Sequence, residues 1–228
     1  MARFTVNGIA LDVPDALLTP RIEDKLTRGT YEADERRAAV MRLRPGMRVL
    51  ELGAGLGFIA ASCAQVTGAE NVTVIEANPT LLPVLRDTFA RNGQAGIRLI
   101  HGAVTGEAAG EPDIGFSAGG AFWAGRIADR GGQETVAVPR LAIGDLFDLC
   151  RPELVVMDIE GAEEHLFDTP WPACVSVVVM ELHPKRYPDR AIKRMIDCLS
   201  ASGLTYDPGP SVGRVLCLRR LRGGGQTG

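Results

Sequence analysis

The chain has 228 residues, about one and a half times a typical domain of ~150 residues, which favours one large domain with additions over two equal domains. Hydrophobic residues make up 46% of the chain and charged residues 23%, as in ordinary globular proteins, and this excludes a disordered, collagen-like or coiled-coil chain. The formal net charge of −3 gives no overall positive field that would attract nucleic acid or an anionic membrane.

The five cysteines are scattered along the chain and contain no C-x-x-C pair, which fits neither a disulfide framework nor a zinc site. We expect reduced and mostly buried thiols. The first 15 residues lack the apolar core of a signal peptide, and no stretch approaches the ~18 apolar residues that cross a bilayer. These patterns predict a cytoplasmic protein with no membrane partner.

The N-terminal segment predicts a hairpin, because two short apolar runs flank Asn7-Gly8, a dipeptide that favours a tight turn. Helical patterns follow over residues 21–28 and 32–43, and Pro45-Gly46 ends the second. We interpret residues 1–45 as a cap formed by the hairpin and these helices.

From residue 46 onward, short apolar runs alternate with helical patterns, which is typical of a doubly wound, mostly parallel α/β sheet. The predicted strands lie at 48–52, 72–76, 97–101, 153–157, 176–182 and 215–219. The predicted helices lie at 58–67, 79–92, 144–150, directly after Asp158, and at 189–201. Residues 46–220 would form this domain, interrupted at 106–139 by a glycine-rich insertion, an irregular hairpin or loop beside the site. Residues 221–228 are predicted to be a flexible tail.

A glycine-rich turn, Gly53-Ala54-Gly55-Leu56-Gly57, follows Glu51 between the first predicted strand of this domain and its helix. Glycines there allow close approach of a ligand to the backbone, and a helix N-terminus offers free N–H groups. Glu76 ends the next strand, where a carboxylate can accept hydrogen bonds from both ribose hydroxyls of a nucleotide-like cofactor. The alternative is a tight connection without a ligand, with Glu76 a solvated strand end.

The details of this turn favour one cofactor class over another. Dinucleotide enzymes favour a third small residue in G-x-G-x-x-G/A, and Phe58 stands at that position. Glu51 would repel a pyrophosphate and could instead hold a cationic group. S-adenosylmethionine is a sulfonium without phosphates, so we prefer it to a nicotinamide cofactor.

Polar residues follow two later strands. Asp158 comes after ELVVM, and Glu181 and His183 come at the end of SVVVMEL. Ligands of open α/β sheets bind outside the carboxyl ends of the strands, so Asp158 should face the cofactor or the acceptor. A histidine among carboxylates would supply a general base or a site for a cation such as Mg²⁺, and a purely structural His183 is equally compatible with the sequence. We interpret Glu163 and Glu164 as helix-capping residues, His101 as structural and His165 as an exposed residue within a helix.

With these residues in place, the chain resembles the FkbM-type family of class I S-adenosylmethionine-dependent methyltransferases. The resemblance covers about residues 29–183. It rests on GTYEADERRAAVMRLRPGMRVLELGAGLG, VIEANP, HGAV, LAIGDLF, VVMDIEGAEEHLF and ELHP. The D-x-E-G-x-E pattern after a hydrophobic strand is the most specific part.

The resemblance implies a seven-stranded Rossmann-like sheet and methyl transfer to a hydroxyl oxygen of a small molecule or sugar. Tyr31 and Glu32 would close over the cofactor. Gly53, Gly55 and Gly57 would surround its methionine part, Glu76 would bind its ribose, and Ala103 and Val104 would meet its adenine. Further candidate cofactor-binding residues are Glu51, Ala77, Asn78 and Gly102. Asp158 would contact the cofactor or acceptor, as the catalytic base or its orienting group, with His183 as the second candidate.

Three other functions remain open from the sequence: a nicotinamide-dependent oxidoreductase, a module that binds S-adenosylmethionine without catalysis, and an RNA methyltransferase. Phe58 and Glu51 disfavour the first, the D-x-E-G-x-E cluster disfavours the second, and the overall charge gives the third no support. We therefore predict a small-molecule or sugar acceptor and no nucleic-acid partner. The oligomeric state and any metal requirement do not follow from the sequence.

Overall fold

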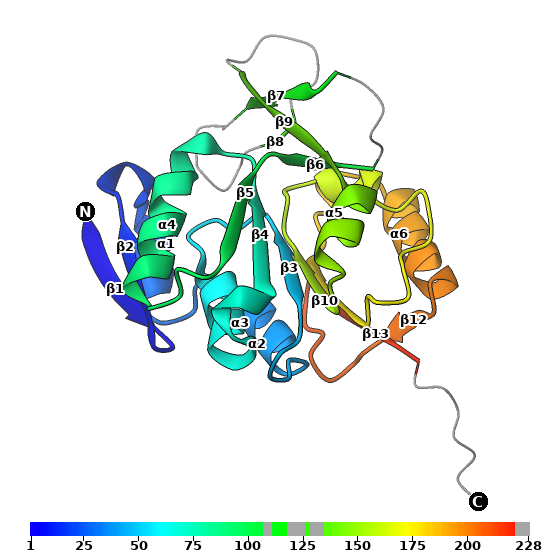
Figure 1. Cartoon of the computed structure of the whole chain (residues 1–228), viewed down its shortest axis with the longest axis horizontal. Coiled ribbons are helices and arrows are strands. Elements are labelled where there is room, and N and C mark those ends of the chain that lie inside the picture. Colours follow the sequence, from blue (N-terminus) through cyan, green and yellow to red (C-terminus); the bar gives the residue numbers. More distant parts are fainter. Residues whose placement is uncertain (107–110, 118–125, 128–134, 222–228) are drawn as a thin grey trace, which may run out of the picture.

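The computed structural model describes residues 1–106, 111–117, 126–127 and 135–221 (Figure 1). Parts of the predicted glycine-rich insertion and all but Leu221 of the predicted tail lie outside the described residues.

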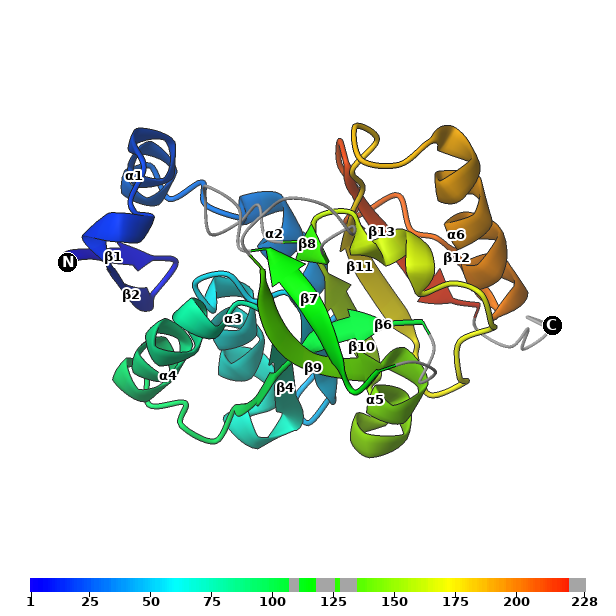
Figure 2. The same cartoon turned by 90° about the horizontal axis from the view of Figure 1, so that it is seen from above.

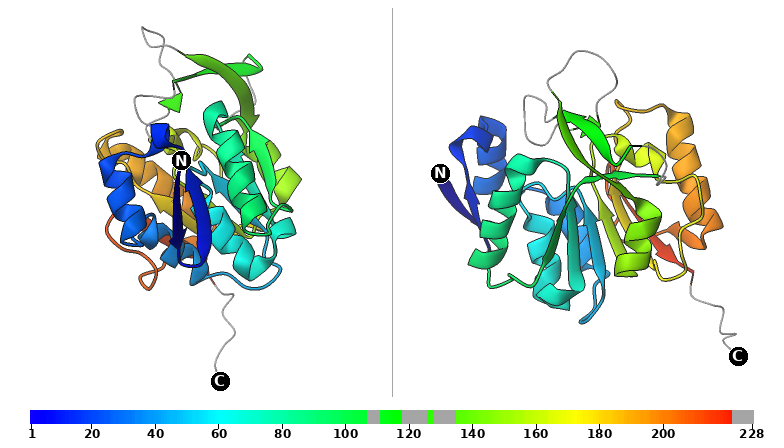
Figure 3. Two further views of the ribbon diagram at one scale, coloured as in Figure 1. Left: turned by 90° about the vertical axis from the view of Figure 1, so that its left-hand side faces the viewer. Right: turned by 45° about the horizontal axis from the view of Figure 1, so that its top comes forward.

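The predicted N-terminal hairpin is confirmed. Strands β1 (Ala2–Val6) and β2 (Ile9–Val13) pair antiparallel, and Asn7 and Gly8 between them both have positive φ angles. Strand β2 contacts the helices α3 and α4, and the side chain of Asn92 both donates to and accepts from the backbone of Ala10. The hairpin is seen face-on in the left view of Figure 3.

The central sheet has seven strands in the order β12-β13-β11-β10-β3-β4-β5. Five neighbouring strands run parallel, and β13 is antiparallel to both β11 and β12. In chain order these strands are β3 (Val49–Leu52), β4 (Val72–Glu76), β5 (Arg98–His101), β10 (Leu154–Met157), β11 (Val177–Glu181), β12 (Leu204–Tyr206) and β13 (Val215–Arg220). The predicted mostly parallel, doubly wound α/β sheet of seven strands is therefore confirmed.

Alternation along these strands produces two buried faces. Val49, Val74 and Val156 belong to one apolar cluster, whereas Leu50, Ile75 and Val155 belong to another. Helices α2, α3 and α4 contribute to the first cluster, and α5 and α6 to the second. The sheet is thus buried on both faces, as expected for parallel strands. The α-helices of the described residues are α1 (Pro20–Thr27), which contacts β1 of the hairpin, α2 (Ala33–Val40), α3 (Phe58–Thr67), α4 (Leu82–Arg91), α5 (Ile143–Cys150) and α6 (Asp189–Ala201). Short 3-10 helices cover Asp15–Leu17, Ala69–Asn71, Pro79–Leu81 and Ala162–His165.

A second sheet, with the order β6-β9-β7-β8, begins directly after β5. It consists of β6 (Ala103–Thr105), β7 (Asp113–Ser117), β8 (Arg126–Ile127) and β9 (Val136–Ala142). Because β6 follows β5 after one residue, this sheet starts at the edge where the parallel strands end. It lies at the top of the molecule in Figure 1 and in front of the central sheet in Figure 2, which is seen from above. The described parts of the predicted insertion are therefore strands beside the site.

Several local predictions need correction. The segment after Asp158 forms only the 3-10 helix Ala162–His165 and not an α-helix, so His165 ends a single turn, with its side chain 66% exposed. Strand β12 escaped prediction because three residues are too few to show alternation. All five cysteines are free, but only Cys63 and Cys217 are buried. Among the described residues, no helix is long and apolar enough to cross a membrane.

Candidate active site

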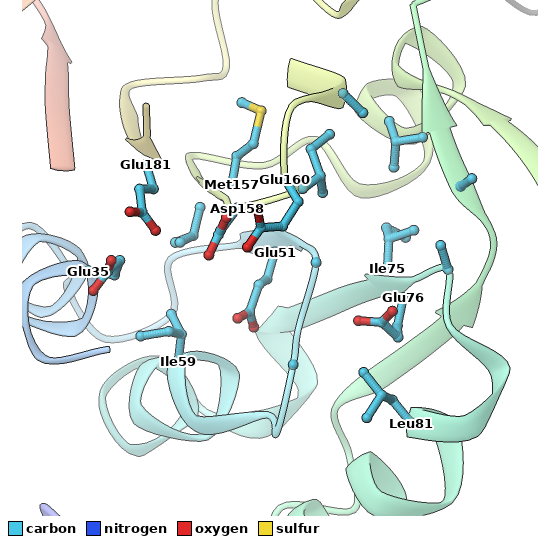
Figure 4. A pocket seen from close by; sticks show the side chains of 18 of the residues that line it. Glu35, Glu51, Ile59, Ile75, Glu76, Leu81, Met157, Asp158, Glu160 and Glu181 are labelled. Atoms are coloured by element: carbon cyan, nitrogen blue, oxygen red, sulfur yellow. The ribbon is translucent and has the colours of Figure 1, made fainter. Parts of the chain in front are cut away.

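A cavity lies where the parallel strands end and has a volume of about 1020 Å³, including the space at its mouth (Figure 4). Strand register creates it. Leu52 lies beside Ile75 and Met157, and Met157 lies beside Met180, so the residues that follow (Gly53, Glu76, Asp158 and Glu181) stand in one row at the sheet edge. All four line the cavity. This is the edge at which open α/β sheets bind ligands.

The cavity brings together most of the predicted site residues. It is lined by Tyr31, Glu32, Glu51, Gly53, Gly55, Glu76, Ala77, Gly102, Ala103, Val104 and Asp158. Three predicted residues do not line it. Gly57 faces the side chains of Phe89 and Leu85, Asn78 caps the next turn through Thr80, and His183 stands behind Asp158.

Glu51 is a buried carboxyl group that the protein leaves partly unsatisfied. Its residue is 2% exposed, and its Oε2 atom has no hydrogen-bond partner in the described part of the chain. Burial first, and then the charges of Glu32 and Glu76, raise the pKa of Glu51 well above its usual value. A buried oxygen without a partner is costly, and a bound cationic or donor group would remove that cost.

Glu76 is held by the backbone of the two loops that flank it. Its carboxylate accepts hydrogen bonds from the N–H groups of Ala54, at 3.0 Å, and Asn78, at 2.7 Å. Burial raises the pKa of Glu76, whereas these N–H groups lower it. The carboxylate is thereby fixed at the cavity wall, in the orientation from which it can accept further hydrogen bonds from a ligand.

Tyr31 and Glu32 form the wall contributed by the N-terminal cap. Tyr31 is 4% exposed and packs edge-on against Phe58, with the ring centroids 5.9 Å apart. Burial raises the pKa of Glu32 to about 8, although a hydrogen bond with Tyr31 acts in the opposite direction. Glu32 and Glu160 both line the cavity with φ angles in the left-handed region, 46° and 54°. Such strained residues cluster at functional sites, where the surrounding structure enforces the conformation.

Asp158, whose side chain is 33% exposed, forms an ionic cluster with the buried His183 and Glu163. The Nε2 atom of His183 lies 3.0 Å from Asp158 Oδ1 and 3.6 Å from Glu163 Oε1. Burial lowers the pKa of His183, but the hydrogen bond with Asp158 and the charges of Glu163, Asp158 and Glu160 outweigh it and raise the pKa to about 9. The imidazole is therefore protonated at neutral pH and donates its Nε2–H to Asp158.

Glu163 stabilises the turn that presents Asp158 and Glu160. Its two carboxylate oxygens accept the N–H groups of Ile159 and Gly161, both at 2.8 Å. The predicted capping function is therefore confirmed, although it serves a 3-10 turn. The side chain of Glu163 is 0% exposed, and burial raises its pKa to about 7. Glu163 thus both shapes this turn and faces the imidazolium of His183.

The structure adds residues that the sequence did not single out as site residues. They are Glu35, Glu160 and the apolar Ile59, Ile75, Leu81, Phe116, Val156, Met157, Ile159, Ala162 and Val179. Glu181, which the sequence already places at a strand end with His183, lines the cavity as well. Two features of the sequence could have indicated some of these residues. Glu35 is three residues after Glu32 on one helix face, and Ile75, Val156 and Val179 come near the ends of parallel strands.

Asp158, Glu160 and His183 are the described group whose ligand atoms, all within 4.8 Å of one another, would suit a metal ion. In the structure Nε2 of His183 lies 3.0 Å from Oδ1 of Asp158, at hydrogen-bond distance, so a proton on Nε2 would lie between them. A divalent cation would have to replace that proton, so the predicted Mg²⁺ stays a prediction.

The donor set at this cavity fits S-adenosylmethionine. Glu51 supplies an unpartnered carboxylate oxygen for an ammonium group, and Glu76 supplies acceptors for hydroxyl groups. Among the described lining residues the ionisable side chains are carboxyl groups and Tyr31, with no lysine or arginine to bind a pyrophosphate. The fit therefore favours a cationic cofactor over a dinucleotide.

A family model described as the methyltransferase FkbM domain matches residues 51–206 of the chain. No curated protein is significantly similar to the chain.

Solved structures with related folds are distant in sequence. A protein from Streptococcus mutans assigned as a SAM-dependent methyltransferase has a TM-score of 0.51 and 12% identity, covering 95% of this chain and 55% of that one. A precorrin-6y C5,15-methyltransferase from Geobacter metallireducens has a TM-score of 0.48 and 14% identity, covering 91% of each chain. An O-methyltransferase from Bacillus cereus in complex with SAH has a TM-score of 0.46 and 10% identity, covering 91% of this chain and 84% of that one. The first likeness supports the fold and nothing finer.

Proposed function

Because this chain belongs to the methyltransferase FkbM domain family, we propose that it transfers the methyl group of S-adenosylmethionine to a hydroxyl oxygen of a small molecule or sugar. That it is an S-adenosylmethionine-dependent methyltransferase follows from the family and the fold. The hydroxyl acceptor and the roles of individual residues are the proposed part. The observation that carries them is the placement of Asp158 on the cavity wall, with its Oδ1 atom 3.0 Å from Nε2 of the buried His183.

The cofactor would be held by the predicted residues that line the cavity. Glu51 would bind its ammonium group and Glu76 its ribose hydroxyls, while Tyr31 and Glu32 would cover it. Gly102, Ala103 and Val104 would meet its adenine, with the apolar side chains of Ile75 and Leu81 nearby in the same cavity. Gly57 and Asn78 would act indirectly, by packing against α4 and by capping the turn after β4.

The chemistry requires removal of one proton, because a neutral hydroxyl is a poor nucleophile. When bound, S-adenosylmethionine supplies a methyl group on a sulfonium, whose sulfur keeps the electron pair of the broken carbon–sulfur bond. Asp158 would accept the hydroxyl proton as the acceptor oxygen bonds to the methyl carbon. His183 does not line the cavity and neighbouring carboxylates raise its pKa to about 9, so its proposed role is to orient Asp158 through Oδ1.

The Asp158→Asn variant tests this proposal. The amide cannot accept the proton, so turnover should fall by about 10²–10⁴-fold, while S-adenosylhomocysteine should bind within about twofold of wild type. Transfer of the labelled methyl group and calorimetric binding measure the two effects. Asp145→Asn, on an exposed position of α5, is the matched control and should change neither. Wild-type turnover by Asp158→Asn would show that the base assignment is wrong.

The family assignment disfavours the nicotinamide-dependent alternative, and calorimetry with both cofactors checks it: saturable binding of NAD without binding of S-adenosylmethionine would contradict the assignment. The absence of a nucleic-acid partner stays a prediction. Retention on a polyanion resin at physiological salt would count against it.

A further inference from the structure

The charged surface of the cavity has one sign. Seven carboxyl groups line it, and no lysine, arginine or histidine does so among the described residues. The carboxyl groups are those of Glu32, Glu35, Glu51, Glu76, Asp158, Glu160 and Glu181. Figure 4 shows Glu76 on one side of the cavity, Glu35 and Glu181 facing each other on the opposite side, and Glu51, Asp158 and Glu160 between them.

The side of Glu35 and Glu181 lies away from the residues proposed for the nucleoside. Glu35 comes from α2, Asp158 follows β10, and Glu181 ends β11, so three separate elements bring carboxyl groups to one place. These groups are close enough to influence one another: burial raises the pKa of Glu35, and the charges of Glu181 and Asp158 raise it further. Ile59 and Val179 give the same part of the cavity apolar walls.

The cations that balance these carboxyl groups stand behind them. Arg214 contacts Glu181 at 2.5 Å, Arg186 contacts Glu160 at 3.6 Å, and His183 contacts Asp158 at 3.0 Å, but none of the three lines the cavity. Glu35 has no ion pair with any residue in the described part of the chain. A ligand therefore meets carboxylates on this side, one of them uncompensated.

A second observation is a buried polar atom in this cavity that the described residues leave without a partner. The Oε2 atom of Glu51 is buried, lines the same cavity and has no hydrogen-bond partner among the described residues. One cationic cofactor group satisfies Glu51, but Glu35 and Glu181 are on the other side of the cavity from Glu76 and are left for the acceptor.

We propose that the acceptor is an amino alcohol or amino sugar, whose protonated amine binds between Glu35 and Glu181 while its hydroxyl group faces Asp158. This inference rests on the proposed function. Acceptors that carry phosphate or carboxylate groups, including nucleic acids, are disfavoured because no described cation on the cavity wall would replace their lost hydration. An ammonium group beside Glu35 would gain a charge-assisted hydrogen bond in a partly buried place.

Fractionated metabolites test the acceptor class without knowledge of its identity. A small-molecule extract of the cells that make the protein is separated by ion exchange into cationic, neutral and anionic fractions, and each fraction is incubated with the full chain and methyl-labelled S-adenosylmethionine. We expect the label in the cationic fraction, on an oxygen atom of the product.

The other outcomes separate the two proposals. Label from the neutral or anionic fraction overturns the amine inference and leaves the small-molecule methyltransferase in place. Label on nitrogen supports a cationic acceptor and overturns the hydroxyl assignment. No label in any fraction, from protein that binds S-adenosylhomocysteine, overturns the small-molecule acceptor and the inference together.

Variants of neighbouring residues locate the amine. Glu35→Gln should lower kcat/KM for the cationic acceptor by about tenfold, because it removes one charge–charge contact and keeps the shape. Asp34→Asn, next to it on an exposed position of α2, is the control and should leave kcat/KM unchanged. S-adenosylhomocysteine binding within about twofold of wild type establishes that both variants are folded. Equal kcat/KM for Glu35→Gln and wild type contradicts the assigned amine position.

Discussion

At the level of single residues, the central question is how the protein keeps charged groups in a buried site. His183 is 6% exposed, yet its pKa is raised to about 9, because Asp158, Glu163 and Glu160 surround it. A buried imidazolium costs desolvation energy that only close carboxylates can offset. The charge of His183 is therefore a property of the cluster, and it should change when one member is replaced.

Glu163→Gln should lower the pKa of His183, because it removes one negative charge 3.6 Å from Nε2 without changing side-chain size. It should also cost about 1–3 kcal/mol of the free energy of unfolding, since one of the N–H groups of Ile159 and Gly161 loses its acceptor. Titration of the imidazole by NMR measures the pKa, and chemical denaturation measures the stability.

The control for this variant is the neighbouring Glu164→Gln. The side chain of Glu164 lies 3.9 Å from His165 and has no ion pair with His183 in the described structure. It should leave the titration of His183 unchanged. An unchanged titration in Glu163→Gln would mean that Glu163 serves only as a cap of the turn.

At the level of elements, the site depends on how closely two loops approach. The loop after β3 passes the loop after β10, and a Cβ atom on Gly53, where φ is +80°, would lie 2.1 Å from the backbone oxygen of Asp158. Gly53 thus serves the packing of the two loops, in addition to its proposed contact with the cofactor. The sequence motif predicts that Gly53 is important, but only the structure shows that the backbone of Asp158 leaves no room for a side chain there.

Gly53→Ala should destabilise the protein by several kcal/mol and weaken S-adenosylhomocysteine binding, because the loop of Asp158 must move. Gly46→Ala is a matched control, since its φ of +77° imposes the same backbone strain with no atom within 4 Å of the added Cβ. It should cost only about 1–2 kcal/mol and leave binding unchanged. Denaturation and calorimetry measure both variants. Equal losses in the two variants would show that the φ angle, not the close approach, is responsible.

Sequence patterns predicted the repeating elements well and the local exceptions poorly. Short apolar runs that alternate with helical patterns predicted β3, β4, β10 and β11, whose ends form the site. Strands that are buried on both faces require such continuous apolar runs. The helix expected after Asp158 was wrong because Glu163 binds the N–H groups of Ile159 and Gly161 and stabilises a short turn instead. The sequence did not predict Glu35 as a site residue, because a carboxylate on a short helix is usually solvated. Only the structure shows that this helix lies beside the strand ends that form the cavity.

At the level of the whole molecule, the buried acidic site predicts how stability depends on pH. Burial raises the pKa of Glu32 to about 8 and that of Glu163 to about 7, while neighbouring carboxylates raise that of His183 to about 9 despite its burial. At neutral pH the folded chain therefore holds more protons than the unfolded chain. Stability falls with rising pH wherever the folded state binds more protons, so these groups stabilise the fold at low pH and lose that effect as pH passes their folded pKa values.

We therefore expect the ligand-free protein to be more stable at pH 6 than at pH 8.5, by on the order of a few kcal/mol, in denaturation experiments at constant ionic strength. Asp207, whose pKa is lowered by its hydrogen bond to Arg42, has the opposite sign but acts only in acid, outside this interval. Glu32→Gln removes one of the titrating groups and should make the slope shallower, whereas Glu23→Gln, on an exposed position of α1, should not. A stability that stays constant or rises between pH 6 and 8.5 would contradict this prediction. It would mean that the carboxyl groups of the cavity are ionised at little cost, because water in the open cavity hydrates the seven of them and they need not take up protons.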